Sequence, residues 1–358
     1  MIKKTFVKLL LFVVVLSSVS TISATEKPET IKIGFIGSLT GFAAAYGNEA
    51  LNGARLAIEE NSTHSNIQLV VEDDASDVKN GLSSFEKLVS VDRVSAIITG
   101  TWWANSIVKP AEARGIPLIS VETSFNKDSV SGESYFIMQG YLRDWVNVYE
   151  PLIQKKNWRR GAIIHFTSGF GQTLAEEMKK IFSYQDRELV ADLEYSDLNI
   201  SEVRSLVLKL KSIKPDVLYF DGQPQSLAMT IKRLREVGMA TLPIITNSIA
   251  EDMCQNNLFD CKIIDSLYFS KRGEIGIDFS PKYQARYQKS PYLNSDLAYH
   301  GARMLIDVLA KSDPVNYIKE SMFEVDGVKF RFDDKNVLQG IKHQIWEVQS
   351  GELVKLDL

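Results

Sequence analysis

The chain has 358 residues, of which 45% are hydrophobic and 24% are charged, as in an ordinary globular protein and unlike a disordered chain. Its 41 basic and 45 acidic residues give a formal net charge of −4 at pH 7. This balance argues against a nucleic-acid-binding surface, which needs clustered positive charge. At roughly 150 residues for each domain, the length predicts about two domains.

The first 24 residues have the pattern of a secretory signal peptide. Lys3 and Lys4 precede an apolar stretch at 9–16, and small residues follow at 17–24. The apolar stretch is too short for a membrane anchor, because a spanning helix needs about 20 residues. Cleavage after Ala24 would leave 38 basic and 45 acidic residues, a net charge of −7. No cysteine lies near the cut, so we expect a periplasmic protein without a lipid anchor.

The chain contains two cysteines, Cys254 and Cys261. An exported protein meets oxidising conditions, in which paired thiols usually become disulfides. A zinc site is the alternative, but it needs about four nitrogen or sulfur ligands, and no histidine lies nearby in the sequence. We therefore expect a local disulfide and no metal site.

The first part of the mature chain alternates β-rich runs with helical patterns. Apolar runs predict strands at 31–37, 67–71, 94–99 and 118–120. Asn48 is the expected N-cap of the first helix, and Asp77 that of a second helix ending at Val89. A third helix is expected to run to Arg114 and stop at Gly115.

The alternation of predicted strands and helices restarts after a β-rich run at 135–138. Strands are predicted at 162–166, 217–220, 244–245 and 267–269, two late helices at 281–288 and 296–310, and a final antiparallel portion at 328–332 and 344–348. This alternation predicts an α/β protein with mostly parallel sheets between helices. Periodicity alone leaves open a single eight-stranded barrel. The restart near residue 139 and the different last third favour two sheets.

The candidate site follows from the strand ends. In open parallel sheets, ligands bind outside the carboxyl ends of the strands. Here these ends are 37–47, 100–105, 120–124, 167–171, 221–223 and 246–248, and they are rich in hydroxyl, amide and aromatic side chains. Such groups suit a small polar solute.

No enzymatic signature is present in the sequence. It lacks the phosphate-binding loop, the dinucleotide fingerprint and the nucleophile elbow, so no cofactor is expected. Asp73 and Asp74 are expected to cap turns rather than to catalyse. Trp102 and Trp103 follow a strand end, and neighbouring residues on a turn rarely point the same way. We expect one ring in the core and the other lining the cleft.

Four stretches carry a resemblance to a known family: 31–41 with Tyr46 and Gly47, 70–77, 115–120, and the paired helices at 279–305. They are similar to stretches of the branched-chain amino-acid-binding proteins, type I periplasmic binding proteins that serve ABC importers. The resemblance implies two Rossmann-like lobes joined by a three-strand hinge, with the ligand cleft between them. Crossovers near Gln139, Ser270 and Ile341 would give lobe 1 residues 25–139 and 271–340, and lobe 2 residues 140–270 and 341–358.

The resemblance also implies a ligand site. Its residues would be Tyr46, Thr101, Trp102, Trp103, Ala104, Glu122, Ser124, Phe170, Gln223, Asn247 and Ser248. Tyr46 would cover the ligand, and the segment 101–104 would hold its carboxylate. Related amino-acid binders place an acidic partner of the ligand ammonium within 246–248, and this chain has none there. Either Glu122 replaces that acid or the ligand is not an amino acid.

The resemblance implies a solute-binding protein of an ABC importer, which captures an amino acid or a related amide or carboxylate by hinge closure. The expected partners are that small ligand and membrane permease subunits. We expect a monomer that does not bind nucleic acid. The alternative is a sensor of the same fold that signals to a partner, and it needs the same cleft. An exported enzyme is disfavoured because a catalytic constellation is missing.

Overall fold

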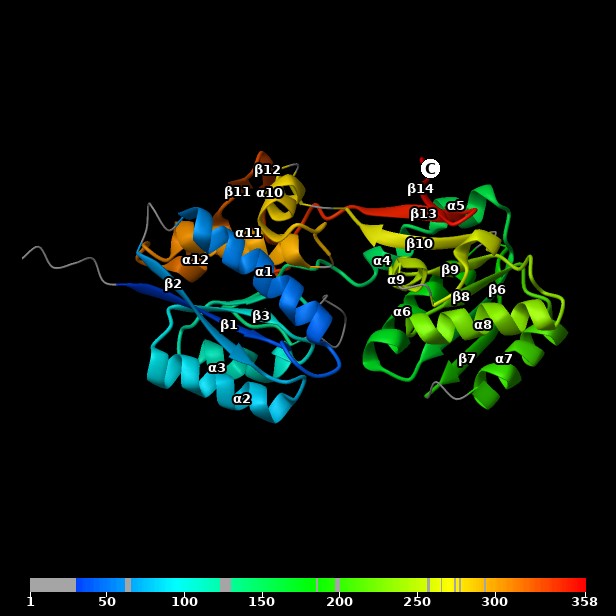
Figure 1. Cartoon of the computed structure of the whole chain (residues 1–358), viewed down its shortest axis with the longest axis horizontal. Coiled ribbons are helices and arrows are strands. Elements are labelled where there is room, and N and C mark those ends of the chain that lie inside the picture. The colour runs from blue at the N-terminus through cyan, green and yellow to red at the C-terminus, as the bar shows by residue number, and fades with distance from the viewer. Residues whose placement is uncertain are drawn as a thin grey trace, which may run out of the picture.

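The computed structural model describes residues 30–61, 66–122, 130–184, 186–196, 200–255, 258–264, 266–273, 275–276, 278–292 and 294–358. The expected signal peptide and Ser124 lie outside these residues. Within the described ranges, no helix is long and apolar enough to cross a membrane. The chain forms two lobes, seen side by side in Figure 1.

The first lobe is built on a sheet of five parallel strands. Their order is β2-β1-β3-β4-β5, with bounds β1 (Ile31–Gly37), β2 (Ile67–Asp73), β3 (Ala96–Gly100), β4 (Leu118–Ser120) and β5 (Tyr135–Ile137). Side chains of a strand alternate between the two faces of its sheet. Phe35 accordingly packs in a cluster with residues of the helices α1 and α11, whereas Ile36 packs in another cluster with residues of α2 and α3.

The helices of this lobe come from both ends of the chain. One face carries α1 (Ala44–Asn61), α10 (Phe279–Tyr287), α11 (Ser295–Val308), α12 (Pro314–Glu320) and the hairpin β11 (Phe323–Val325) and β12 (Val328–Phe330), and the other carries α2 (Val78–Lys87), η1 (Leu88–Asp92), η2 (Ala104–Ile107) and α3 (Val108–Glu112). The contact between α1 and α11 is close, because a Cβ on Gly53 would lie 1.8 Å from the carbonyl oxygen of Ser295. The late segment therefore completes the first lobe.

Helix capping agrees with the sequence at one start and differs at another. Asp77 accepts a hydrogen bond from the Asn80 amide at 3.0 Å and caps α2, as expected. The helix α1 begins at Ala44 rather than after Asn48. The Asn48 side chain instead donates to the carbonyls of Leu39 and Ala44, at 2.9 and 2.7 Å. That expected N-cap is wrong, because Asn48 lies inside α1 and its side chain ties the helix to the preceding turn.

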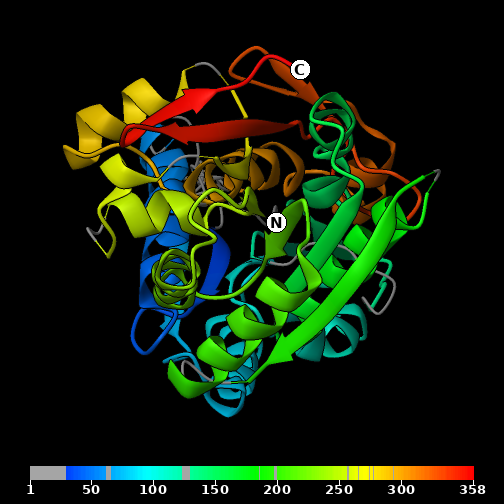
Figure 2. The ribbon, with the colours of Figure 1, turned by 90° about the vertical axis from the view of Figure 1, so that its right-hand side faces the viewer.

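The second lobe contains a sheet of seven strands. Their order is β14-β13-β10-β9-β8-β6-β7, with bounds β6 (Arg160–Phe166), β7 (Glu188–Tyr195), β8 (Val217–Phe220), β9 (Ile244–Thr246), β10 (Leu267–Arg272), β13 (His343–Gln349) and β14 (Glu352–Lys355). The last two strands are antiparallel to their neighbours and the others are parallel. Figure 2 shows the red pair β13 and β14 at one end of the sheet and the green strand β7 at the other.

Helices cover both faces of this second sheet. One face packs against α4 (Asp144–Asn147), α5 (Glu150–Lys155) and α6 (Gly169–Phe182), and the other against α7 (Ile200–Ile213), α8 (Pro224–Glu236), α9 (Ile249–Gln255) and η3 (Cys261–Ile263). A disulfide joins Cys254 of α9 to Cys261 of η3, with their Cα atoms 5.6 Å apart. It joins two cysteines that are seven residues apart in the sequence.

The chain passes between the two sheets three times: after β5, after β10 and between β12 and β13 (Figure 1). At the second crossing, Arg272 at the end of β10 pairs with Asp296 at the start of α11. The Arg272 Nη1 and Nη2 atoms donate to Asp296 Oδ2 and Oδ1, at 2.7 and 2.5 Å. The two side chains are only 9% and 3% exposed. This buried ion pair therefore fastens a strand of the second sheet to a helix of the first lobe.

Substitution Asp296→Asn should lower the free energy of unfolding by about 3–5 kcal/mol, because it leaves the buried guanidinium of Arg272 without a counter-ion. Urea denaturation measures the change. The control Glu86→Gln breaks an exposed pair with Arg114, so it should cost at most about 1 kcal/mol. An Asp296→Asn effect as small as that of the control would contradict a structural role for the buried pair.

The disulfide gives a second expectation. Because it closes a loop of sequence separation 7, the double substitution of Cys254 and Cys261 by serine should cost roughly 2–3 kcal/mol of stability. Intact-mass analysis of the exported protein should show a gain of two hydrogens on reduction. Two alkylatable thiols before reduction would contradict the bond.

Candidate functional site

Two adjoining cavities lie where the lobes meet. The first, here called the interlobe pocket, has a volume of about 240 Å³ and is lined by Tyr46, Glu122, Gln139, Trp145, Phe166, Ser168, Phe170, Asp221, Gly222, Gln223, Asn247, Ser248, Ile249 and Asn294. The second, the hinge pocket, has a volume of about 500 Å³ and lies beside the β10 crossing. Trp145, Ser248 and Asn294 line both cavities.

Strand ends of both lobes supply the interlobe pocket. Glu122 and Gln139 follow β4 and β5 of the first sheet. The segments 168–170, 221–223 and 247–249 follow β6, β8 and β9 of the second. The carboxyl ends of the parallel strands in both sheets therefore face one cavity, as the rule for open parallel sheets requires.

Glu122 brings a carboxyl group into this pocket from the first lobe. Its Oε1 atom is buried and has no hydrogen-bond partner among the described residues. Burial raises the pKa of Glu122 to about 7, and the Asn294 side chain and the charge of Arg272 act in the opposite direction. The structure shows no ion pair of Glu122 within its described part.

Asp221 brings a second carboxyl group from the other lobe, and its residue is 3% exposed. The Asn247 amide donates to its Oδ1 atom at 3.0 Å. Burial raises the pKa of Asp221 to about 7, while the hydrogen bonds from the Asn247 side chain and the Phe166 backbone lower it. No lysine, arginine or histidine is among the described residues that line this pocket.

Aromatic rings form much of the remaining wall. Tyr46 and Phe170 are 39% and 42% exposed, so their rings are open to the cavity and to solvent. Trp145 meets Phe170 edge to face, with ring centroids 5.9 Å apart. The Trp145 indole nitrogen is buried and has no hydrogen-bond partner among the described residues. Such walls can hold the apolar body of a ligand or a cation over a ring face.

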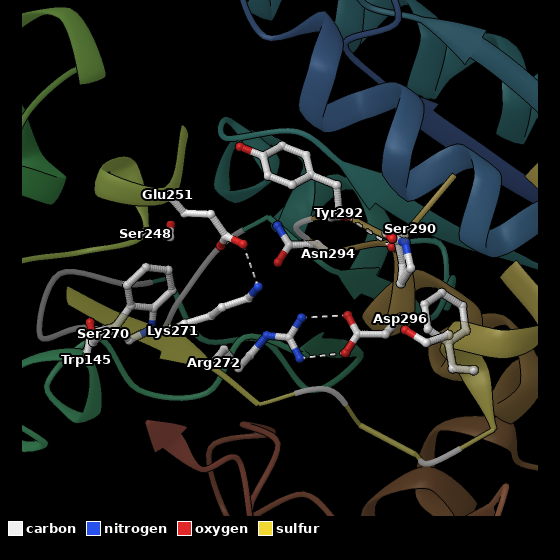
Figure 3. Close-up of a pocket in the computed structure, with 14 residues that line it drawn as sticks. Trp145, Ser248, Glu251, Ser270, Lys271, Arg272, Ser290, Tyr292, Asn294 and Asp296 are labelled. Atoms are coloured by element: carbon white, nitrogen blue, oxygen red, sulfur yellow. Dashed lines mark hydrogen bonds and ion pairs between the residues drawn. The ribbon is translucent and has the colours of Figure 1, made fainter. Parts of the chain in front are cut away.

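The charged groups of the hinge pocket neutralise one another (Figure 3). Lys271 Nζ donates to Glu251 Oε1 at 2.8 Å, and Arg272 holds Asp296 with two parallel hydrogen bonds. Asp296 also accepts the backbone N–H of Ile275 at 3.0 Å. The hinge pocket is larger, but its charges already have partners, so the interlobe pocket is the better candidate for ligand binding.

The structure brings six of the expected site residues together. Tyr46, Glu122, Phe170, Gln223, Asn247 and Ser248 line the interlobe pocket. Thr101, Trp102, Trp103 and Ala104 line neither cavity, and Ser124 lies outside the described residues. The segment expected to hold a ligand carboxylate is thus not at the pocket.

The two tryptophans take different environments. Trp103 is 3% exposed, and its indole N–H donates to Asp74 Oδ2 at 2.9 Å. Its ring lies against Gly81, where a Cβ would come within 1.8 Å of the ring. Trp102 is 54% exposed and neighbours Phe42. Trp103 therefore stabilises the turn after β3, and Trp102 faces solvent outside both cavities.

Several lining residues were missed by sequence reasoning. Asp221 and Ser168 lie in strand-end segments that the sequence did identify, so their signal was present. Trp145 and Asn294 come from α4 and from the start of α11, next to the lobe crossings. Neither residue directly follows a strand, so a rule based on strand ends cannot predict them.

The chain is similar to proteins of a known family. The sequence profile described as periplasmic binding protein matches residues 30–331. The chain belongs to the periplasmic binding protein family. The resemblance to this family and the two-lobed α/β fold, both predicted from the sequence, are confirmed. A curated relative, the Leu/Ile/Val-binding protein homolog 7 of Brucella suis, is 23% identical over 94% of each chain.

Solved structures show the same fold. LivJ of Streptococcus pneumoniae, a branched-chain amino acid transporter substrate-binding protein in complex with isoleucine, superposes with a TM-score of 0.74 at 21% identity, over 92% of this chain and 99% of that one. A solute-binding protein of R. palustris in complex with benzoate gives a TM-score of 0.75 at 18% identity, over 92% and 96%. Members of this family are extracytoplasmic solute-binding proteins of ABC transporters rather than enzymes.

The raised pKa values of Glu122 and Asp221 predict a stability cost at high pH. At pH values below the ordinary pKa of a carboxyl group, the protonated form of each acid contributes fully to the stability of the ligand-free fold. This contribution is lost as the pH rises through about 7. Glu122→Gln and Asp221→Asn should therefore raise the melting temperature by a few degrees at pH 8 and have little effect near pH 4. Thermal unfolding across this pH range measures the effect.

The control is Glu86→Gln, which removes an exposed carboxylate paired with Arg114. It should show no such dependence on pH. A melting temperature that falls at pH 8 in both pocket variants would mean that the two carboxylates stabilise the fold and are not strained by burial.

Proposed function

We propose that this protein captures a small polar ligand between its two lobes and delivers it to the permease subunits of an ABC importer. The observation that carries the proposal is a single pocket lined from the strand ends of both sheets. A ligand bound there contacts both lobes at once. Its binding energy therefore favours the conformation in which the lobes approach each other.

The three chain crossings support hinge closure. We take the lobes to be residues 25–139 with 271–340, and residues 140–270 with 341–358. The crossing after β10 carries the Arg272–Asp296 pair, so it is stiffer than a free linker. Closure then amounts to small changes in backbone dihedral angles at the three crossings, with each lobe moving as a rigid body.

Proteins of the same fold indicate the size and class of the ligand. They include a substrate-binding protein in complex with isoleucine and a solute-binding protein in complex with benzoate. The corresponding ligand here is an amino acid or a related small molecule of similar size. Residues 1–24 would direct export, and the mature protein would act in the periplasm as a monomer without a lipid anchor.

A ligand screen tests this function. Amino acids, amides, small carboxylates and amines are added to the purified protein, and thermal unfolding is followed. A true ligand at 100 times its dissociation constant should stabilise the fold by about 2.7 kcal/mol. The same ligand should reduce the radius of gyration in small-angle X-ray scattering, and an unchanged radius at saturation would contradict closure.

Aromatic substitutions connect the ligand to the pocket. Tyr46→Ala and Phe170→Ala remove one ring from each lobe and should each weaken binding by about tenfold or more, since burying a large apolar side chain is worth about 1.5–3 kcal/mol. Phe42→Ala is the matched control, because Phe42 is an exposed ring, 80% accessible, that lines neither cavity. Equal losses in all three variants would place the ligand elsewhere.

A further inference from the structure

We infer that the ligand is a small organic cation whose positive group lies between Glu122 of the first lobe and Asp221 of the second. This inference rests on the proposed function and names the chemical class of its ligand. It depends on three features of the interlobe pocket: its two acids, the absence of a cation among its described lining residues, and its aromatic walls.

The two carboxyl groups enter one cavity from opposite sides. Glu122 follows β4 of the first sheet, and Asp221 follows β8 of the second. Asp221 is 3% exposed and the Oε1 atom of Glu122 is buried, and an ionised carboxylate without a positive partner is costly in such surroundings. A positive group on the ligand can neutralise both, and it needs neither lobe to supply a counter-ion.

Arg272, the cation whose charge acts on Glu122, does not fill this role. Arg272 lowers the pKa of Glu122, but its guanidinium makes two hydrogen bonds to Asp296. It lines the hinge pocket and not the interlobe pocket. Among the described lining residues, the carboxyl groups therefore face a cavity with two acids and no cation.

The interlobe pocket is unfavourable for a ligand carboxylate. Two lining amides already donate elsewhere, that of Asn247 to Asp221 and that of Gln139 to the Val121 carbonyl at 3.0 Å. The unpartnered indole N–H of Trp145 is a neutral donor and supplies no positive charge. The hydroxyl and turn at Thr101, expected to hold such a group, lie outside the pocket. A zwitterion would add a third negative charge to two existing ones.

The aromatic walls fit the rest of an organic cation. Trp145, Phe166, Phe170 and Tyr46 line the same cavity as the acids. Ring faces attract alkylammonium and amidinium groups, and rings also shield the apolar part of the ligand from water. Inorganic cations would use only the carboxyl groups and would leave this surface unfilled.

The protonation of the acids supports the same conclusion. Glu122 faces Asn294 and the charge of Arg272, and Asp221 faces Asn247, the Phe166 backbone and the phenols of Tyr195 and Tyr219. Burial holds the pKa of both carboxyl groups near 7. A cation favours their ionised form, so binding should release protons and weaken as the pH falls below 7.

Matched small molecules test the charge. Isothermal titration at pH 8 compares leucinamide with leucine and 4-methylpentanoate, choline with its uncharged isostere 3,3-dimethylbutan-1-ol, and a set of alkyl amines and guanidines with the corresponding alcohols. At least one cation should bind about tenfold or more tightly than its partner compound, since a charge-assisted contact contributes that much.

Two results would overturn the inference. If leucine or 4-methylpentanoate binds as tightly as leucinamide, the cation preference is wrong while solute capture stands. If no cation in the set binds, the inference also falls, and the screen of amino acids, amides and carboxylates decides the proposed function separately.

Variants locate the positive group. Glu122→Gln and Asp221→Asn should each lower the affinity for the bound cation by about tenfold or more without lowering the melting temperature. Both variants should flatten the loss of affinity between pH 8 and pH 6. The control Glu86→Gln removes the same charge at the surface and should leave affinity unchanged. Wild-type affinity in either pocket variant would overturn the bridging arrangement.

Discussion

The buried pair of Arg272 and Asp296 is the constraint that fixes the second chain crossing, where the end of β10 meets the start of α11. Asp296 accepts two hydrogen bonds from Arg272 and two more from the backbone N–H groups of Ile275 and Leu297. Burial alone would raise the pKa of Asp296, but the guanidinium beside it reverses the direction and lowers that pKa. Since both charges are fully hydrogen-bonded, the cost of their desolvation is offset. The pair can therefore hold the end of β10 against the start of α11.

The same pair positions part of the ligand site. Asn294 stands two residues before Asp296 and lines both cavities. Its side chain and the charge of Arg272 both lower the pKa of Glu122, against the larger effect of burial. Charged groups with ion-pair partners thus lie at the crossing, and carboxyl groups without such partners lie in the pocket. This division is expected of a binding protein, because polar groups left without partners cost stability and gain partners only from the ligand.

The sequence predicted the elements whose pattern is local. Continuous apolar runs indicated the buried parallel strands such as β1, β6 and β8, and the Asp77 cap was placed correctly. The strand β7 was missed, since Glu188–Tyr195 lies at a sheet edge and carries a polar, partly exposed pattern. Trp145 and Asn294 were missed for another reason. Only the crossings of the chain, which are set by tertiary packing, bring them to the pocket.

The acids show why the chemistry of the site could be predicted only in part. Asp73 is the last residue of β2 and Asp221 follows β8, and the sequence alone does not distinguish the two acids. Asp73 accepts the backbone N–H groups of Leu39, Thr40 and Ala75 at 2.8–3.2 Å, and its pKa is lowered by these hydrogen bonds although burial opposes them. Asp221 has fewer donors, and burial prevails. A carboxylate whose donors are all supplied by the fold stabilises a turn. One that still lacks donors in a closing cleft has capacity left for a ligand.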